Sequence, residues 1–145
     1  MKYLKATAIL FIVTLILSTI TASATDGFSS VVGVTLPTLG GEVDATTGYK
    51  TELGKQYYKS NGTVDMLTSK YVNIKVKTRN TSNVESTWLT LGRLDTAYWE
   101  EVENYNTGSY TLVARRENWA LSEAKHSGSW YLNQSLYELV NQENN

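Results

Sequence analysis

The feature that most constrains the fold is the absence of cysteine from a chain that opens with the pattern of an export signal. A short basic start precedes an apolar run over residues 6–20, and Ala22-Ser23-Ala24 supplies the small residues that signal peptidase accepts. We therefore expect a secretory signal peptide over residues 1–24, cleaved after Ala24, and a secreted, extracellular mature protein. A domain exported without disulfides must be stabilised by its hydrophobic core alone.

The same composition excludes several function classes. Without cysteine, the chain has no disulfide, no thiol nucleophile and no thiolate metal site. Small exported domains of eukaryotes usually contain disulfides, so we expect a bacterial source. The 14 acidic residues outnumber the 13 basic ones, two of which belong to the signal segment. This balance argues against nucleic acid as a partner.

Residue patterning predicts an all-β protein. After the signal segment, β-branched and aromatic residues outweigh strong helix formers. In the clearest strand, over residues 69–79, Val72, Ile74 and Val76 alternate with polar and cationic residues. Asn61-Gly62 is a typical turn signal. Further short strands are expected over residues 31–36, 86–91, 98–102, 109–116 and 130–132. Strands of this length, separated by turn signals, predict a small antiparallel β-sandwich or barrel.

The expected domain organisation has three parts. Residues 1–24 are the signal peptide, and residues 25–48, rich in glycine and poor in charge, form a flexible N-terminal arm or an edge strand. Residues 49–145 form a single β-domain. Its last segment has Leu136, Leu139 and Val140 at helical spacing, which predicts a short C-terminal helical turn.

Candidates for catalysis are few. His126 is the only histidine, and its polar neighbours predict a surface turn. Glu101 and Glu103 would share one face of a strand, which leaves open a carbohydrate-active enzyme with paired glutamates. Solvent-exposed charge at a strand edge accounts for the same pair without catalysis. We therefore predict no catalytic residue, no metal site and no cofactor.

Aromatic and cationic side chains are the candidates for binding. Tryptophan and tyrosine rings stack on sugars or lie at a lipid interface, but they also fill protein cores. We expect Trp88 and Trp130 to pack in the core. The expected binding residues are the aromatic Tyr98, Trp99, Tyr105 and Trp119, on an exposed ridge, and the cationic Lys75, Lys77 and Arg79, on a strand face. Such cations suit the anionic groups of wall polymers or lipid headgroups.

The closing segment Ser127-Gly128-Ser129-Trp130-Tyr131-Leu132-Asn133 follows a cysteine-free region of polar and aromatic strands. With the signal segment, this plan resembles the small secreted β-proteins of Gram-positive bacteria, some of them similar to lactococcin 972-type bacteriocins. The resemblance implies a β-sandwich that acts on the envelope of sensitive cells. It lies in the organisation of the chain, so no individual functional residue is carried over.

Three function classes follow. The first is a secreted, non-enzymatic β-domain that binds a cell-envelope component, either a cell-wall polymer or a membrane surface, with bacteriocin-like antagonism as its most specific form. The second is a small carbohydrate-active enzyme that uses the paired glutamates. The third is a structural protein of an extracellular matrix or coat. The sequence alone determines neither the ligand nor the oligomeric state.

Overall fold

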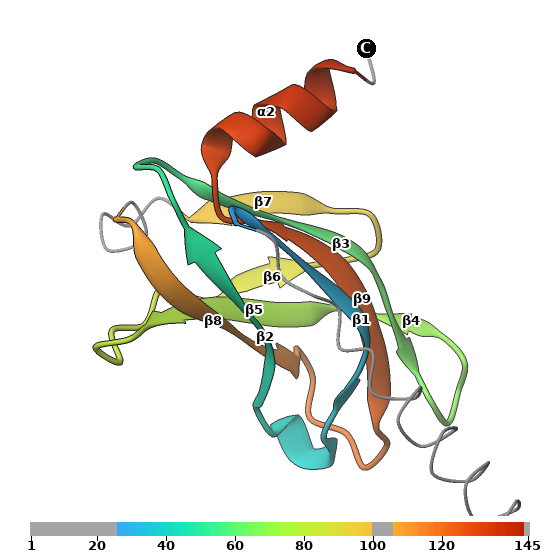
Figure 1. The fold of residues 1–145 in the computed structure, drawn as a ribbon. Helices are drawn as coiled ribbons and strands as arrows, with labels where there is room; N and C mark the ends of the chain where they lie inside the picture. The colour runs from blue at the N-terminus through green and yellow to red at the C-terminus, as the bar shows by residue number, and fades with distance from the viewer. Residues whose placement is uncertain (1–25, 100–105, 144–145) are drawn as a thin grey trace, which may run out of the picture.

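The computed structural model describes residues 26–99 and 106–143. Most of this chain forms strands that pair antiparallel in two sheets (Figure 1). The strands are β1 (Phe28–Leu36), β2 (Val43–Lys50), β3 (Gln56–Asp65), β4 (Tyr71–Val72), β5 (Ile74–Asn80), β6 (Leu89–Leu91), β7 (Thr96–Trp99), β8 (Gly108–Arg116) and β9 (Ala124–Tyr131). One sheet has the order β1-β9-β3-β4, with β7 also paired to β3, and the other has the order β2-β8-β5-β6.

The strand pairing is nested. β1 pairs with β9, β2 with β8, β3 with β7, and β5 with β6. A long hairpin of eight strands that is wound into two facing sheets has this pairing, which is the arrangement of a jelly roll. β4 adds two residues beside β3. The prediction of an all-β antiparallel fold is confirmed, and the chain adopts the sandwich form.

The hydrophobic core lies between the two sheets. Its largest side chains are Tyr58, Trp99 and Trp130, and all three are completely buried. Trp99 donates its indole N–H to the carbonyl of Thr87 at 3.1 Å, and Trp130 donates to Oε1 of Gln56 at the same distance. Core packing is confirmed for Trp130. The exposure expected of Trp99 is wrong, because the last residue of β7 points inward against both sheets.

The segment before residue 49 belongs to the sandwich. β1 lies at the edge of the larger sheet and β2 at the edge of the smaller one. The expected boundary after residue 48 falls inside β2. The turn expected at Asn61-Gly62 is also wrong, because both residues lie within β3. There the register with β9 shifts, and the positive φ of Gly62, beneath the ring of Tyr71, permits a bulge in place of a turn.

A C-terminal helix, α2 (Gln134–Gln142), follows β9 as predicted. Its start is bound to the connection between β2 and β3, where Ser135 donates its backbone N–H to Glu52 at 2.8 Å. Tyr137 stacks on Tyr57 of β3, with ring centroids 3.9 Å apart. No helix in the described residues is long and apolar enough to cross a membrane.

Candidate functional site

Three connections lie together at one end of the sandwich. The first, residues 37–42, joins β1 to β2 and contains the short helix η1 (Thr38–Gly40). The second, residues 66–70, joins β3 to β4, and the third, residues 117–123, joins β8 to β9. Figure 1 shows η1 beside the connection between β8 and β9.

Backbone hydrogen bonds hold the three connections to one another. Leu39 donates its N–H to the carbonyl of Ala120 at 2.7 Å, which joins the first connection to the third. Met66 donates its N–H to the carbonyl of Glu123 at 2.9 Å, which joins the second to the third. The connections therefore form one surface, although they are far apart in the sequence.

This surface carries large apolar side chains in solvent. Leu67 is 82% exposed, Leu121 77% and Trp119 67%, while Met66 and Leu39 are about half exposed. Single exposed apolar residues are normal on a protein surface, but a group of them at one place marks a binding surface. We name these five residues the apolar loop end. Trp119 is the one aromatic binding candidate from the sequence that it contains.

The backbone of this surface is strained at Leu39. Its φ is +62°, in the left-handed region that bulky side chains rarely adopt. The side chain gains little from packing, since it is half exposed, and the hydrogen bond to Ala120 holds the backbone in place. Backbone strain of this kind is often found at binding sites, where the surrounding structure fixes an unfavourable conformation.

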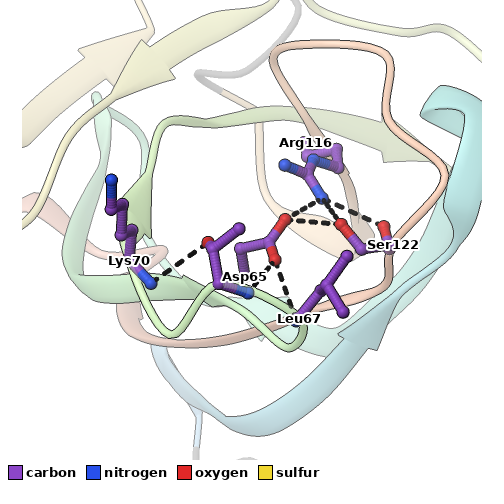
Figure 2. A network of polar contacts seen from close by, with 6 residues as sticks. Asp65, Leu67, Lys70, Arg116 and Ser122 are labelled. Carbon is purple, nitrogen blue, oxygen red and sulfur yellow. Dashed lines mark hydrogen bonds and ion pairs between the residues drawn. The ribbon is translucent and has the colours of Figure 1, made fainter.

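A buried carboxylate connects two of the loops from beneath (Figure 2). Oδ1 of Asp65 accepts the backbone N–H groups of Leu67 and Thr68, both at 2.9 Å. Its Oδ2 accepts from the guanidinium of Arg116 at 2.9 Å and from the hydroxyl of Ser122 at 2.5 Å. Hydrogen bonds from Ser122 and Thr68, followed by that from Arg116, hold the pKa of the Asp65 carboxyl well below its usual range. The ionised network fixes the loops from which Leu67 and Leu121 project.

The structure separates the other aromatic candidates from this surface. Tyr98 lies on β7, where the ammonium of Lys55 is 4.2 Å from its ring centroid. β7 pairs with the start of β3, opposite the end of β9, whereas Trp119 precedes the start of β9. Tyr98 and Trp119 therefore share no ridge. Tyr105 and the glutamate pair Glu101 and Glu103 lie outside the described residues.

The three cationic candidates follow β5 on the outer face of the smaller sheet, but they differ in surroundings. Lys77 is buried, its Nζ lies 2.7 Å from Glu85 and 3.3 Å from Glu42, and it sits over the ring of Trp88. This ring and two carboxylates enclose Lys77, so its charge is already compensated within the protein. Trp88 itself is half-buried on the outer face, not in the core.

The remaining two cationic candidates contrast with each other. Arg79 pairs with Asp44 at 2.8 Å. Lys75 is half-buried and makes no ion pair with a described carboxylate. Of the predicted cationic face, only Lys75 thus has a charge that the described part of the protein leaves uncompensated.

His126 is buried, which corrects its expected position in a surface turn. Its Nε2 lies 2.5 Å from the hydroxyl of Tyr58, and its Nδ1 lies 2.7 Å from the hydroxyl of Thr63. Burial lowers the pKa of His126 to about 4. β9 begins at Ala124, earlier than expected, and period-two alternation then turns His126 inward. The alternation of Ala124, His126, Gly128 and Trp130 is the signal that identifies this strand.

Lys50 is a second buried titratable residue that the sequence did not single out. Its ammonium donates to the carbonyl of Leu132 at 2.5 Å, and burial lowers its pKa to about 8. The charge is therefore less favourable inside the protein than in water, although a pKa of about 8 leaves Lys50 mostly protonated at pH 7.

We expect Lys50→Met, which keeps the apolar stem and removes the charge, to raise the urea midpoint of unfolding at pH 7. The advantage over the wild type should shrink as the pH rises from about 8 toward 10, because folded Lys50 then loses its proton while unfolded Lys50 retains it. A lower midpoint for Lys50→Met at pH 7 would show that the ammonium stabilises the fold.

Within residues 26–99 and 106–143, no group of three or more histidine, aspartate and glutamate side chains is placed to hold a metal ion. The buried side chains of Lys50, Asp65 and His126 are engaged in internal hydrogen bonds, and the apolar loop end is the surface with the clearest binding chemistry.

Neither a model of a known protein family nor a curated protein matches the sequence. The fold is similar to a mitogen derived from Yersinia pseudotuberculosis, with 14% identity, a TM-score of 0.41, and coverage of 76% of this chain and 89% of the mitogen. It is also similar to PirA, with 13% identity, a TM-score of 0.36, and coverage of 75% and 95%. The glycosylation-associated protein complex Gap123 from Streptococcus agalactiae has 10% identity, a TM-score of 0.33, and coverage of 77% and 41%. At identities and TM-scores this low, no function is transferred to this chain.

Proposed function

We propose that this protein is a secreted, non-enzymatic β-sandwich that binds the lipid surface of a cell envelope through the apolar loop end. The observation that supports this most directly is the exposure of Leu67, Leu121 and Trp119 on connections that are hydrogen-bonded together. Aliphatic side chains gain free energy when they leave water for lipid and little when they meet a hydrated polysaccharide. A membrane surface therefore suits this site better than a wall polymer.

The free energy expected from burying these side chains in lipid is suited to reversible binding. Full burial of a leucine or methionine side chain contributes about 1.5–3 kcal/mol, and the five side chains are already half or more exposed in the free protein. Tryptophan favours the interface between headgroups and acyl chains, where its ring is apolar and its N–H finds a polar partner. Together these side chains form a shallow anchor.

The Asp65 network supports the same role. Ordering a loop on binding costs free energy, which weakens the complex. Here the carboxylate of Asp65 already fixes the backbone at Leu67 and the hydroxyl of Ser122 in the free protein. The apolar side chains are therefore presented to lipid before contact is made.

The double substitution Leu67→Ser/Leu121→Ser tests the proposal. We expect at least a tenfold loss of binding to phosphatidylcholine vesicles, measured by co-sedimentation, because about 1.4 kcal/mol corresponds to each tenfold change. The emission of Trp119 should shift to the blue when the wild type binds.

Leu53→Ser is the matched control. Leu53 is 71% exposed in the connection between β2 and β3, which binds α2 and not the apolar loop end. Its substitution should leave vesicle binding unchanged. Equal binding by wild type and Leu67→Ser/Leu121→Ser, or an equal loss in Leu53→Ser, would refute the proposal.

The bacteriocin-like form of this function predicts that the purified protein inhibits the growth of sensitive bacteria and that Leu67→Ser/Leu121→Ser does so less. Membrane binding without any inhibition would restrict the function to adhesion at the envelope surface.

A further inference from the structure

Lys75 and Arg115 form a pair of cations on the outer face of the smaller sheet that no described carboxylate compensates. They lie directly opposite each other on β5 and β8. Ion pairs to carboxylates within 4.0 Å are formed by their neighbours Lys77 and Arg79, whereas neither Lys75 nor Arg115 forms one with any described residue. Like charges placed opposite each other on a sheet destabilise it. The fold therefore keeps two adjacent cations at a cost.

Packing against Trp88 holds Arg115 in place but leaves one of its donors without an acceptor among the described residues. Its guanidinium lies 4.9 Å from the ring centroid of Trp88. Its Nε is buried and has no hydrogen-bond partner among the described residues. Ser60 Oγ and Arg116 Nε share this state, but of the three residues only Arg115 lies on the cationic outer face of the smaller sheet, where an external ligand can approach its guanidinium. The adjacent Arg116 points inward to Asp65, so the two arginines serve opposite faces of the sheet.

The surroundings favour an anion as this ligand. Thr90, an exposed residue of β6, lies opposite Lys75 on the side away from Arg115. Its hydroxyl therefore belongs to the same cross-strand row as the two cations. Glu117, the acidic residue nearest to Arg115 in sequence, accepts a hydrogen bond from the amide of Asn73 at 2.9 Å. A planar guanidinium beside an ammonium suits the oxygens of a phosphate group.

We propose that Lys75 and Arg115 form a binding site for a phosphodiester group. Arg115 lies two residues before the connection 117–123, which carries Trp119 and Leu121, and Lys75, the second residue of β5, lies opposite Arg115. The hydrogen bond from the N–H of Glu117 to the carbonyl of Asn73, at 3.0 Å, closes this end of the sheet. Phosphodiesters are present both in phospholipid headgroups and in polyol-phosphate polymers of bacterial envelopes.

The test compares Lys75→Gln/Arg115→Gln with a charge-matched control, Lys59→Gln/Lys125→Gln. Lys59 and Lys125 are exposed on the larger sheet, on β3 and β9. Circular dichroism first establishes that both variants are folded. Soluble poly(glycerol phosphate), titrated calorimetrically without vesicles, measures the polymer source. Phosphatidylcholine vesicles with and without phosphatidylglycerol measure the headgroup source.

We expect Lys75→Gln/Arg115→Gln to lower the affinity for at least one of these phosphodiester probes about tenfold or more, and the control to lower it far less. Binding of the wild type to that probe should weaken as salt is added. Loss confined to poly(glycerol phosphate) identifies the polymer as the source, and loss confined to phosphatidylglycerol identifies the lipid headgroup. If neither probe distinguishes this variant from the control, the site does not exist.

The test of the phosphodiester site can fail or succeed independently of the test of lipid binding by the apolar loop end. Lys75→Gln/Arg115→Gln retains the apolar loop end, so it should still bind vesicles of phosphatidylcholine alone. Leu67→Ser/Leu121→Ser retains both cations, so it should bind poly(glycerol phosphate) like the wild type if the polymer is the source.

Discussion

Lowering the pH from 7 to 4 is expected to reduce the free energy of unfolding by about 3 kcal/mol through His126 alone. The folded protein holds this imidazole neutral, because burial lowers its pKa to about 4, whereas the unfolded chain has the ordinary value of about 6.5. Between these two values the unfolded chain binds a proton that the folded chain does not. Stability is therefore complete above about pH 6.5 and is lost as the pH falls toward 4.

The hydrogen bonds explain why the neutral form is retained. Burial raises the pKa of the Tyr58 hydroxyl, so Tyr58 keeps its proton beside Nε2 of His126. Nδ1 faces the hydroxyl of Thr63, so both ring nitrogens of the neutral imidazole have a hydroxyl as hydrogen-bond partner. Protonation would place a positive charge and a second N–H inside an apolar core. No described carboxylate forms an ion pair with His126 to offset the charge.

Urea denaturation between pH 7 and 4, compared between wild type and His126→Gln, measures the effect. Asp65 contributes in a lower window, because its pKa in the folded state lies below the ordinary value, and its stabilisation is lost only as the pH falls below about 4. Since the chain has one histidine, its ring proton resonance reports His126 directly. A resonance that titrates near 6.5 in the folded protein, or an unchanged pH dependence in His126→Gln, would contradict the prediction.

The sequence predicts the strands that have one polar and one apolar face. In residues 109–116, the side chains alternate between the two faces of the strand, and this segment forms β8. The same alternation in β5 turns Ile74 and Val76 into the core. Alternation does not predict which polar residues are buried, whether in the core, as His126 is, or beneath other side chains on the outer face, as Lys77 is. From the sequence, Lys77 and His126 are expected at the surface, because the residues that enclose them, Glu42 and Tyr58, are distant in the chain.

The candidate site was less accessible to sequence reasoning. Leu67, Trp119 and Leu121 are single apolar residues in polar connections, and no local period links them. Long-range contacts bring them together, above all the hydrogen bonds from Ser122 and Arg116 to Asp65. The nested order of strands that aligns these connections at one end depends on tertiary pairing, which residue patterns do not encode locally.

Gly128→Ala is expected to destabilise the protein by about 2–4 kcal/mol. Gly128 lies on β9 between β1 and β3, opposite Val31 and Ser60. Tyr58, which pairs with Trp130, reaches along β9 past Gly128 to His126. A Cβ at residue 128 would lie 2.7 Å from Cζ of Tyr58. Overpacking of this kind costs about 1–3 kcal/mol, and loss of the hydrogen bond from Tyr58 to His126 adds about 1 kcal/mol.

Relief of this clash is restricted on both sides. The new methyl group would also lie 2.8 Å from the carbonyl oxygen of Lys59, which belongs to the backbone of β3 and cannot rotate away. Tyr58 is completely buried, so its ring has no free space in which to move. The strands β3 and β9 must therefore separate locally, and the pairing of Ser60 with Gly128 should weaken.

Ser129→Ala is the matched control, because Ser129 is half-buried, adjacent on the same strand, and turned to the other face. Thermal and urea unfolding should show a large loss for Gly128→Ala and little change for Ser129→Ala. The resonance of His126 adds an independent reading, since displacement of Tyr58 admits water and should move the pKa of His126 upward from about 4. If the two variants were equally stable, the close approach of Tyr58 to Gly128 would not constrain the fold.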